Sequence, residues 1–473
     1  MGKPKLKVFS NDELRCIHDS SLEILERIGV NITSNVGIKI LERAGAEVQG
    51  KLVKIPSYLV KESIKKAPKH IKLYGREKER ICIGKDNDTI YFKVSGIATN
   101  YLDLNNGRRR QPLSKDLASV VRLIDYLKNI HFLQPPLAPI DHPPKIKTER
   151  YAFLVTLENT TKHISAEAYN SNDVQTILKV GAKIAGNEEE FKKNPVFSII
   201  ICTVSPLIHE AGATSTLIEA AKHKIPIIVS SGPLSGATSP ATLAGTMVQV
   251  NAELLSALTI AEMTANGAPF VYVVSARSMD MRTGNIANGG PEYGLLRICG
   301  AQLGKYYDLP TGVSGLLTDS KIPDIQAGYE AMMSGIMGAL SGADFIMGCS
   351  LKANNAISCE FLIICNEIAG YISRIINGVE VDQETLALPS IKEAISGRSF
   401  IAMKHTLKFV PKEHYVPLIS DRSDWKAWEK EGCRTLHEAA KELAKKIIST
   451  HKPKSLEKNE EIKRIIEEGE NLK

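Results

Sequence analysis

The sequence predicts an α/β protein built on a closed (β/α)8 barrel, preceded by an extension of helices and a small β-sheet. From about residue 113, short β-branched runs alternate with helix-length segments, which is typical of parallel strands joined by crossover helices. Seven such units can be counted. No GxGxxG motif follows a predicted strand, which argues against the competing doubly wound open sheet. A chain of 473 residues is also too long for one small core.

Residues 1–112 are expected to form the extension. A first helix is predicted to begin at the cap Ser10, with Glu13 three residues on, and to end at Gly29. A second helix is expected to end at Gly45, and a third lies between prolines in PSYLVKESIKKAP. The alternating residues that follow, from IKLYGREKE to NNGRRRQP, predict a small sheet.

The barrel is expected over residues 113–424 and a charged helical tail over residues 425–473. The predicted strands are 131–134, 163–167, 197–202, 225–230, 270–275, 311–314 and 343–347. An eighth strand is expected at RSFIAMKH, residues 398–405. In a TIM barrel of this kind, the chemistry lies on the loops that follow the strands.

The composition indicates a cytoplasmic protein with no nucleic-acid or membrane partner. The net charge is +7, but the basic residues are scattered and no aromatic residues are interleaved with them. No apolar run reaches the ~20 residues of a membrane span, and the polar N-terminus does not resemble a signal peptide. The eight cysteines form no CxxC motif and lie mostly in apolar surroundings, as expected of buried thiols in a reducing compartment.

The loop after residues 270–275 is the densest polar segment. Its sequence ARSMDMRTGNIANGGPEYG contains Arg277, Asp280, Arg282, Glu292 and Tyr293, and its glycines allow the backbone to approach a ligand. This pattern indicates the floor of a site. The alternative is an ion pair of Asp280 with an arginine that only holds a long loop in place.

Other loops carry weaker signals. SGPLSGATSPATLAGT can bind an anion at a helix N-terminus, or its caps can simply start a helix. No metal site is predicted, because the histidines show no ligand spacing. Glu360 lies in an almost wholly apolar segment and is expected to be partly buried with a partner. In the loop SGLLTDSKIPD, Leu316 and Leu317 are surrounded by polar residues. Two adjacent large apolar residues are unusual in such a loop.

Segments spread along the chain resemble the trimethylamine methyltransferase family. They include IHDSSLEILERIGV, GPLSGATSPATLAGT, MDMRTG, AQLGKYYDLP, TDSKIPDIQAGYE, ALSGADFIMG and VDQETLAL, in order from about residue 10 to about 450. The resemblance implies a TIM barrel that moves a methyl group from an amine to the cobalt of a separate corrinoid protein. The chain has no DxHxxG cobalamin motif, so the corrinoid cofactor is expected to come with that partner.

The resemblance also implies a substrate class. The family archetype uses pyrrolysine, whose position matches Leu316 or Leu317 here, so the branch without pyrrolysine resembles this chain better. Known substrates there are quaternary amines such as glycine betaine, proline betaine, carnitine and γ-butyrobetaine. A quaternary amine leaves as a neutral tertiary amine, so the enzyme needs only to position and dehydrate the cation.

The expected site residues follow from these considerations. Leu316, Leu317, Thr318 and Asp319 are expected to line the site through their loop. The candidates for contact with the substrate are the aromatic residues Tyr293, Tyr329 and Phe345, the cationic residues Arg277, Arg282 and His405 for a carboxylate, and the acids Asp280, Glu292 and Glu360 for the ammonium. A homo-oligomer is also expected.

Three alternatives remain open at this stage. The chain can be another barrel enzyme, such as an aldolase or lyase with Lys321 or Lys404 as the catalytic lysine. It can be a non-catalytic binder of small cations or of the corrinoid carrier. It can also act on trimethylamine without pyrrolysine, although an amide anion is a poor leaving group.

Overall fold

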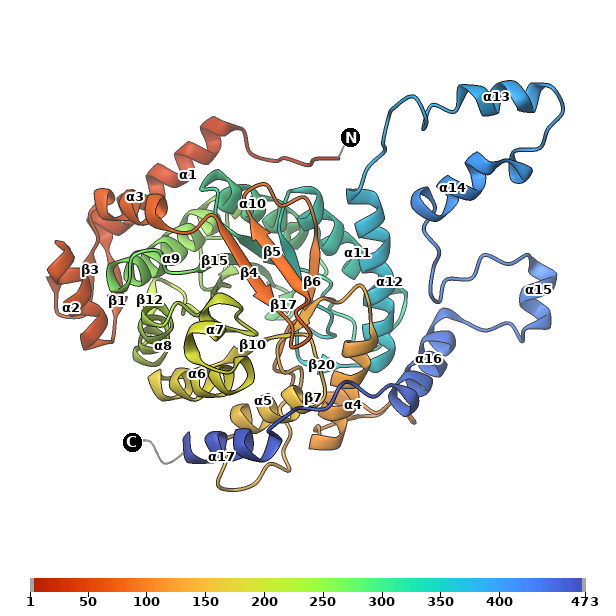
Figure 1. Ribbon diagram of the computed structural model, residues 1–473. Coiled ribbons are helices and arrows are strands. Elements are labelled where there is room, and N and C mark those ends of the chain that lie inside the picture. The colour runs from red at the N-terminus through yellow and green to blue at the C-terminus, as the bar shows by residue number, and fades with distance from the viewer. Residues whose placement is uncertain (1–3, 470–473) are drawn as a thin grey trace.

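The computed structural model describes residues 4–469, so the outermost residues of the predicted extension and tail lie outside the described residues. Eight strands close a barrel, and each neighbouring pair is parallel (Figure 1). Around the barrel these strands are β10 (His163–Glu167), β11 (Phe197–Cys202), β13 (Ile227–Ser231), β15 (Phe270–Val274), β18 (Thr311–Ser314), β19 (Phe345–Gly348), β6 (Tyr91–Val94) and β9 (Phe132–Leu133). The predicted barrel is therefore confirmed.

The eighth strand is the exception, and its prediction at residues 398–405 was wrong. In that segment, Phe400–Ala402 forms a 3-10 turn (η2) and Lys404–Glu413 forms α14, both outside the barrel. The eighth position belongs to β6, which pairs with β19 and β9 and lies within the range expected for the extension. The sequence YFKV alternates like a strand of a small sheet, and only closure of the barrel shows where it pairs.

A helix follows each strand and covers the outside of the barrel. In chain order these helices are α4 (Ser114–Tyr126), α5 (Thr148–Glu158), α6 (Ser171–Ala185), α7 (Glu188–Lys193), α8 (Ala211–Lys222), α9 (Leu243–Thr264), α10 (Pro291–Tyr306), α11 (Ile325–Leu340) and α12 (Cys359–Ile376). Among the described residues, α9 alone is long and apolar enough to cross a membrane. Because 78% of its apolar window is buried inside the protein, it is a core helix.

The N-terminal helices pack against α9 and confirm the predicted caps. Helix α1 (Asn11–Glu23) begins with the capping box of Ser10 and Glu13, and continues as a π-helical turn, η1 (Ile24–Ile28), to Gly29. Helix α2 (Asn35–Ala44) ends at Gly45, whose φ of 106° is left-handed. Helix α3 (Ser57–Lys66) follows, and the strands β1 (Val30–Ile32), β2 (Glu47–Gln49) and β3 (Leu52–Lys54) form a sheet with β12 (Ile208–His209).

A hairpin closes one end of the barrel. Its strands, β4 (His70–Tyr74) and β5 (Arg80–Gly84), place Ile71 and Leu73 in one apolar cluster with Phe132 and Phe345 from the barrel interior. The His163 ring bonds to the carbonyl of Tyr74 at 3.0 Å, which ties this hairpin to the start of β10. Since this end is filled, a ligand must enter from the opposite end, where the strands terminate.

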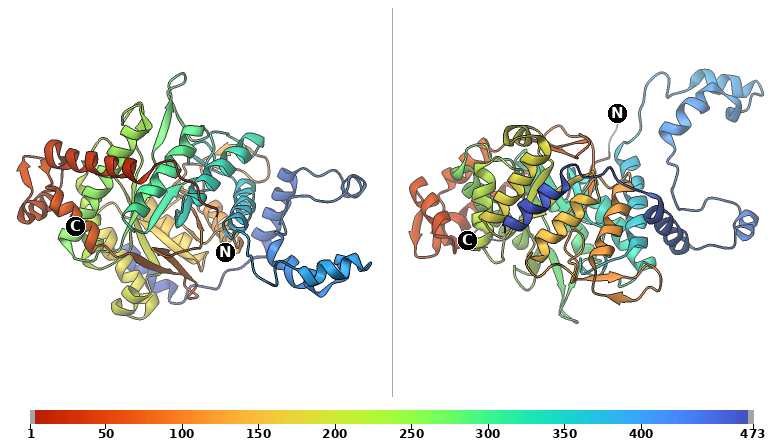
Figure 2. Two further views of the ribbon diagram at one scale, coloured as in Figure 1. Left: turned by 90° about the horizontal axis from the view of Figure 1, so that it is seen from above. Right: turned by 60° about the horizontal axis from the view of Figure 1, so that its bottom comes forward.

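The remaining strands lie in the loops at the open end. They are β7 (Asn100–Leu102), β8 (Arg109–Arg110), β14 (Leu234–Ser235), β16 (Arg277–Asp280), β17 (Asn285–Ala287) and β20 (Ala356–Ile357). After α12 the chain leaves the barrel through α13 (Leu388–Ile395), η2, α14 and α15 (Trp425–Lys430), and returns in α16 (Leu436–Thr450) and α17 (Asn459–Gly469). The excursion projects away from the barrel in all views (Figures 1 and 2).

Candidate functional site

A cavity of about 510 Å³ opens at the carboxyl ends of the barrel strands. Segments at or after the end of every strand contribute to its wall, as expected for the catalytic face of such a barrel. The lining residues include Ser95, Gln134, Glu167, Tyr169, Cys202, Ser230, Ser275, Arg277, Ser314, Leu317, Met347 and Asn354. The lining combines polar side chains with apolar ones such as Leu317 and Met347.

The two adjacent leucines of the loop after β18 have different environments. Leu317 lines the cavity and is almost fully buried. Leu316 packs against α11, where its Cδ2 lies 2.8 Å from the position of a Cβ added to Gly335. Leu316 has a left-handed φ of 53°, which is unfavourable for a branched residue and reverses the backbone between the two side chains. Only Leu317 therefore forms part of the apolar wall.

A carboxylate at the end of β10, Glu167, lines the cavity, as does the exposed Glu210. Glu167 accepts hydrogen bonds from the amide of Gln134 and from the hydroxyl of Tyr169, the latter at 2.8 Å. Burial raises the pKa of Glu167, although both bonds and the nearby Lys93 oppose this effect. Tyr169 is more than half exposed, so it places an aromatic ring at the cavity mouth.

A buried lysine lies beside this carboxylate. Lys93, on β6, is fully buried, and its Nζ lies 3.4 Å from Oε1 of Gln134. Burial lowers the pKa of Lys93 to about 7, with Glu167 acting in the opposite direction. A lysine with a pKa near neutrality changes its charge within the physiological range. The charge next to Gln134 and Glu167 is therefore sensitive to pH.

Arg277 is the cationic residue that lines the cavity. Its backbone N–H donates to the carbonyl of Pro233 at 2.9 Å, in the strand pairing of β16 with β14. Its guanidinium Nε is buried and has no hydrogen-bond partner among the described residues. A buried donor without a partner is costly, so this nitrogen indicates a place for an anionic or polar ligand group.

The other candidates from the same loop do not line the cavity. Asp280 and Arg282 lie at the outer turn of the hairpin β16–β17, where they pair with each other at 3.4 Å and the Arg282 side chain is 91% exposed. Asp280 therefore forms the ion pair with an arginine that was expected as the alternative to a site residue. Glu292 is exposed at the start of α10. The strand β16 turns away from the barrel, so only its first residue reaches the cavity.

The predicted aromatic residues also lie elsewhere. Tyr293 is fully buried, with the guanidinium of Arg297 4.2 Å from its ring centroid, so a protein cation already occupies its face. Phe345 begins β19 and packs on Phe132 below the cavity, with ring centroids 5.2 Å apart. Tyr329 is exposed on α11. None of the three lines the cavity.

The remaining candidates have structural contacts. Asp319 accepts three hydrogen bonds of 2.8–3.0 Å from the backbone N–H groups of Asn288 and Gly289, which tie two loops together. Thr318 donates to Glu330. Glu360 is buried and accepts from Ser358 at 2.6 Å, while His405 is half-buried on α14, outside the barrel. These residues support the loops or lie away from the site.

The structure thus identifies residues that the sequence reasoning missed. Glu167 is the last residue of β10, and Gln134 directly follows β9, two strands whose positions were predicted correctly. The rule that function lies at the carboxyl ends of barrel strands would have selected both. Lys93 was not selected from the sequence, because β6 was assigned to a small sheet of the extension and not to the barrel.

A buried acid supports the loop after β11. Glu253, on α9, accepts hydrogen bonds from the hydroxyls of Thr203, Ser205 and Ser231, from the N–H of Leu207 and from the amide of Gln249, at 2.8–3.0 Å. This one carboxylate holds the wall residues that follow β11. The position of that wall therefore depends on α9.

Replacing this acid is expected to destabilise the protein. Glu253→Leu leaves several buried donors without an acceptor, which costs about 1–3 kcal/mol for each, so the free energy of unfolding is expected to fall by about 3 kcal/mol or more. Urea denaturation followed by circular dichroism measures this. The exposed Glu26→Leu serves as the control and is expected to stay within about 0.5 kcal/mol. An unchanged midpoint for Glu253→Leu would contradict the assigned role.

A closed parallel barrel with a polar cavity at the carboxyl ends of its strands defines a TIM-barrel enzyme. Residues 1–468 match the family model described as trimethylamine methyltransferase (MTTB), and the chain belongs to this family. The members of this family that it resembles are methyltransferases, and we therefore assign the protein to that class of enzyme.

Several relatives support this assignment. Trimethylamine methyltransferase MttB of Desulfitobacterium hafniense (strain DSM 10664 / DCB-2) is 34% identical over 468 residues, which cover 98% of this chain and 94% of that protein. A glycine betaine methyltransferase of Desulfitobacterium hafniense (strain Y51) is 30% identical, over 96% of this chain and 95% of that protein. The monomethylamine methyltransferase MtmB of Methanosarcina barkeri has a TM-score of 0.53 at 11% identity over 94% of this chain and 88% of that chain, which shows the shared fold.

Proposed function

We propose that this enzyme transfers a methyl group from a small quaternary amine with a carboxylate, a betaine, to the Co(I) of a corrinoid held by a separate protein. The observation that carries the proposal is the apolar wall formed by Leu317, because the family resemblance places pyrrolysine at Leu316 or Leu317 and both residues are apolar. An apolar side chain cannot form a covalent adduct with an amine. The methyl donor must therefore be activated before it binds. A quaternary ammonium meets this condition, because it leaves as a neutral tertiary amine.

The reaction balances without a protein nucleophile or acid. Co(I) supplies the electron pair of the new bond to the methyl carbon. The carbon–nitrogen bond breaks, and its electron pair stays on the departing nitrogen as a neutral tertiary amine. The task of the protein is to orient the cation and to exclude water.

The cavity offers a separate partner for each end of a betaine. The carboxylate of Glu167 balances the ammonium charge, and the ring of Tyr169 presents a face to it. The unpartnered guanidinium nitrogen of Arg277 suits the substrate carboxylate. Leu317 and Met347 supply apolar walls for the methyl groups. The cavity opens at the carboxyl ends of the strands, and a corrinoid held by a separate protein would approach the substrate from that side.

The compartment follows from the same proposal. Reduced Co(I) requires a reducing environment, and all eight cysteines of the chain are free thiols. We therefore place the enzyme in the cytoplasm with its corrinoid carrier.

A methyl-transfer assay tests this proposal. The enzyme is incubated with a reduced corrinoid protein and with glycine betaine, proline betaine, carnitine, γ-butyrobetaine or trimethylamine, and the cobalt absorbance is followed. Methylation of Co(I) is expected with at least one betaine and not with trimethylamine. Turnover of trimethylamine alone, the activity in the name of several relatives, would overturn the proposal, as would no turnover with any betaine.

The pH dependence of binding tests the base of the cavity. Below pH 7 Lys93 is charged and opposes a second cation, whereas above pH 7 it is neutral and Glu167 is free to bind that cation. Affinity for choline, a quaternary ammonium without a carboxylate, is therefore expected to rise from pH 6 to pH 8, by up to roughly tenfold. Calorimetry at each pH measures this. Lys93→Met is expected to flatten the profile, and an equally steep profile in that variant would refute the assignment.

A further inference from the structure

The hydroxyl of Ser314 accepts two hydrogen bonds from within the protein. Ser314 is the last residue of β18 and lines the barrel cavity, although only 2% of its surface is exposed. A serine hydroxyl has one proton to donate and two lone pairs that accept. Tyr293 donates its hydroxyl proton to Oγ of Ser314 at 2.9 Å, and Nη1 of Arg297 donates to the same oxygen. Both lone pairs of this oxygen are therefore occupied.

The proton of the same hydroxyl has no acceptor among the described residues. It cannot bond to Arg297, because a guanidinium only donates, and the hydroxyl of Tyr293 already acts as a donor toward Ser314. Another serine of the cavity, Ser95, donates its proton to Oδ1 of Asn354 at 3.1 Å. A buried donor without an acceptor is unfavourable. The proton of Ser314 therefore indicates an acceptor atom on a ligand in the cavity.

Arg297 places a positive charge directly behind this hydroxyl. Its side chain is fully buried, and it donates to the carbonyls of Val274 and Ser314, both at 3.2 Å, and to the carbonyl of Ala276. Burial lowers the pKa of Arg297 to about 10, so the group is still charged at neutral pH. A hydrogen bond from a charged donor polarises the hydroxyl that accepts it. The O–H of Ser314 is therefore a strengthened donor.

A second guanidinium lies on the same side of the cavity. Arg277 follows β15, which pairs with β18 in the barrel. Besides burial, the charge of Arg277 also lowers the pKa of Arg297, which shows that the two groups are close together. Within the described part of the chain, neither arginine forms an ion pair with a carboxylate. Buried charges are normally paired, so a carboxylate from a ligand would complete this side of the cavity.

The opposite side of the cavity carries negative charge. In the closed barrel, three strands separate β18 from β10 in either direction, so the two strands face each other. Glu167 ends β10 and Ser314 ends β18, and both line the cavity. A carboxylate and an oriented hydroxyl donor therefore lie on opposite sides. This arrangement suits a ligand that has a positive and a negative end.

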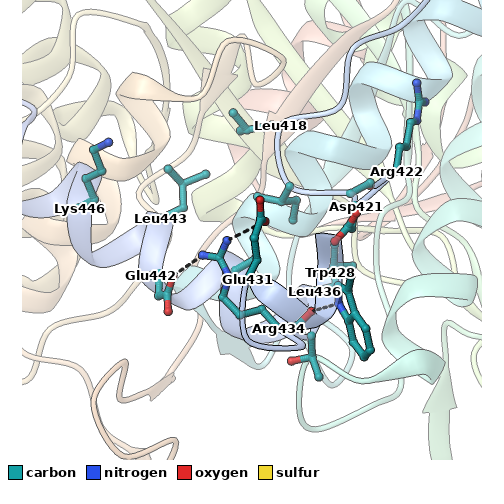
Figure 3. A pocket seen from close by; sticks show the side chains of 14 residues that line it. Leu418, Asp421, Arg422, Trp428, Glu431, Arg434, Leu436, Glu442, Leu443 and Lys446 are labelled. Carbon is teal, nitrogen blue, oxygen red and sulfur yellow. Dashed lines mark hydrogen bonds and ion pairs between the residues drawn. The ribbon is translucent and has the colours of Figure 1, made fainter. Parts of the chain in front are cut away.

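A second hollow of the protein, of about 570 Å³, lacks these features. It lies between the returning segment and α16 (Figure 3), and none of the described residues that line it is buried. Its Arg434 pairs with Glu431 and Glu442, at 3.7 and 2.9 Å. Exposed and mutually paired charges contribute little to the binding of a ligand. The combination of buried cations and a free proton is therefore a feature of the barrel cavity.

We propose that Ser314 is a substrate-binding residue, whose hydroxyl donates to the carboxylate of the methyl donor beside Arg277. Arg297 and Tyr293 are positioning residues, because they act on the substrate only through the direction that they impose on this hydroxyl. The inference rests on the proposed function in that the carboxylate belongs to a betaine. It adds a second contact for that carboxylate and a reason why the contact is oriented before the substrate arrives.

Equilibrium binding to the full-length protein tests Ser314 with three probes. Glycine betaine carries both charges, 3,3-dimethylbutyrate has the same shape with only the carboxylate, and choline has only the ammonium. Calorimetric titration is expected to show that Ser314→Ala binds both carboxylates roughly 10- to 100-fold more weakly. Its affinity for choline is expected to stay within about twofold of wild type, which also shows that the variant is folded.

Two further variants separate recognition from folding. Ser198→Ala is the matched control, because Ser198 is a fully buried serine of β11 that bonds to His163 and Ser165, both at 2.9 Å, and does not line the cavity. It is expected to keep all three affinities. Tyr293→Phe removes one of the two donors but keeps Ser314, so its affinity for the carboxylates is expected to lie between those of wild type and Ser314→Ala, with choline unchanged.

The results that would overturn the inference are specific. They are wild-type affinity for the carboxylates in Ser314→Ala, an equal loss for choline in Ser314→Ala and Tyr293→Phe, or a wild-type protein that binds neither carboxylate. The titrations need no methyl transfer, so they are independent of the cobalt assay. Carboxylate discrimination by Ser314 without cobalt methylation would reject the proposed reaction alone. Methylation from a betaine with wild-type KM in Ser314→Ala would reject the role of Ser314 alone.

Discussion

Replacing Arg277 with glutamine is expected to lower kcat/KM for a betaine by roughly 10- to 150-fold. The reason is that a hydrogen bond to a charged group contributes about 1.5–3 kcal/mol, and the guanidinium of Arg277, which lines the cavity, would bind the substrate carboxylate. The loss is expected mainly in KM, because the carboxylate lies away from the methyl group that reacts. The corrinoid methylation assay with each betaine measures both parameters.

The same loop supplies the control for this prediction. Arg282→Gln changes the same residue type five positions later, but at an exposed turn outside the cavity. Its kcat/KM is expected to stay within twofold of wild type. A quaternary ammonium without a carboxylate should bind Arg277→Gln as well as it binds wild type. If Arg277→Gln and Arg282→Gln behave alike, Arg277 does not recognise the carboxylate.

Replacing Glu167 with glutamine is expected to weaken binding of every quaternary amine, with or without a carboxylate. At an effective dielectric constant of about 20, charges about 5 Å apart interact by about 3 kcal/mol, which corresponds to roughly a 100-fold loss of affinity. Glutamine keeps the size of the side chain, so the change tests charge rather than packing. Calorimetric titration with glycine betaine and with choline measures the loss.

Glu292→Gln is the matched control, because this exposed acid was an equal candidate on sequence grounds and does not line the cavity. It is expected to leave both affinities unchanged. The two active-site variants also distinguish recognition of the substrate carboxylate from recognition of its ammonium group. Arg277→Gln should discriminate between the two ligands, whereas Glu167→Gln should affect both. Normal choline binding in Glu167→Gln would exclude this carboxylate as the ammonium partner.

Barrel architecture was largely predictable because its signals are local. All seven predicted strands overlap barrel strands, since buried parallel strands are short β-branched runs between helices. The prediction of the eighth barrel strand was wrong, because a strand as short as β6 does not show in its sequence which strands it pairs with. Barrel closure depends on contacts between residues 91–94 and strands far along the chain, and no local pattern records those contacts.

The site was predictable only as a set of loops. The sequence indicated the loops after β15 and β18, and each contributes residues to the cavity. It did not separate side chains that enter the cavity from those that support it. Asp319 and Tyr293 look functional by residue type, but their contacts are backbone amides and a buried arginine.

By itself, the sequence determined the helix caps, seven of the eight barrel strands with the helices between them, and the presence of apolar residues where the family resemblance places pyrrolysine. Only the tertiary structure decided which side chains face the substrate. Leu316 and Leu317 are adjacent, yet a left-handed backbone turn sends one to α11 and the other to the cavity. Arg277 and Arg282 belong to one hairpin, yet only the first lies beside the barrel. The direction in which a side chain points depends on the whole path of the backbone. A local sequence pattern fixes only the spacing of side chains along the chain, and not the surface toward which they point.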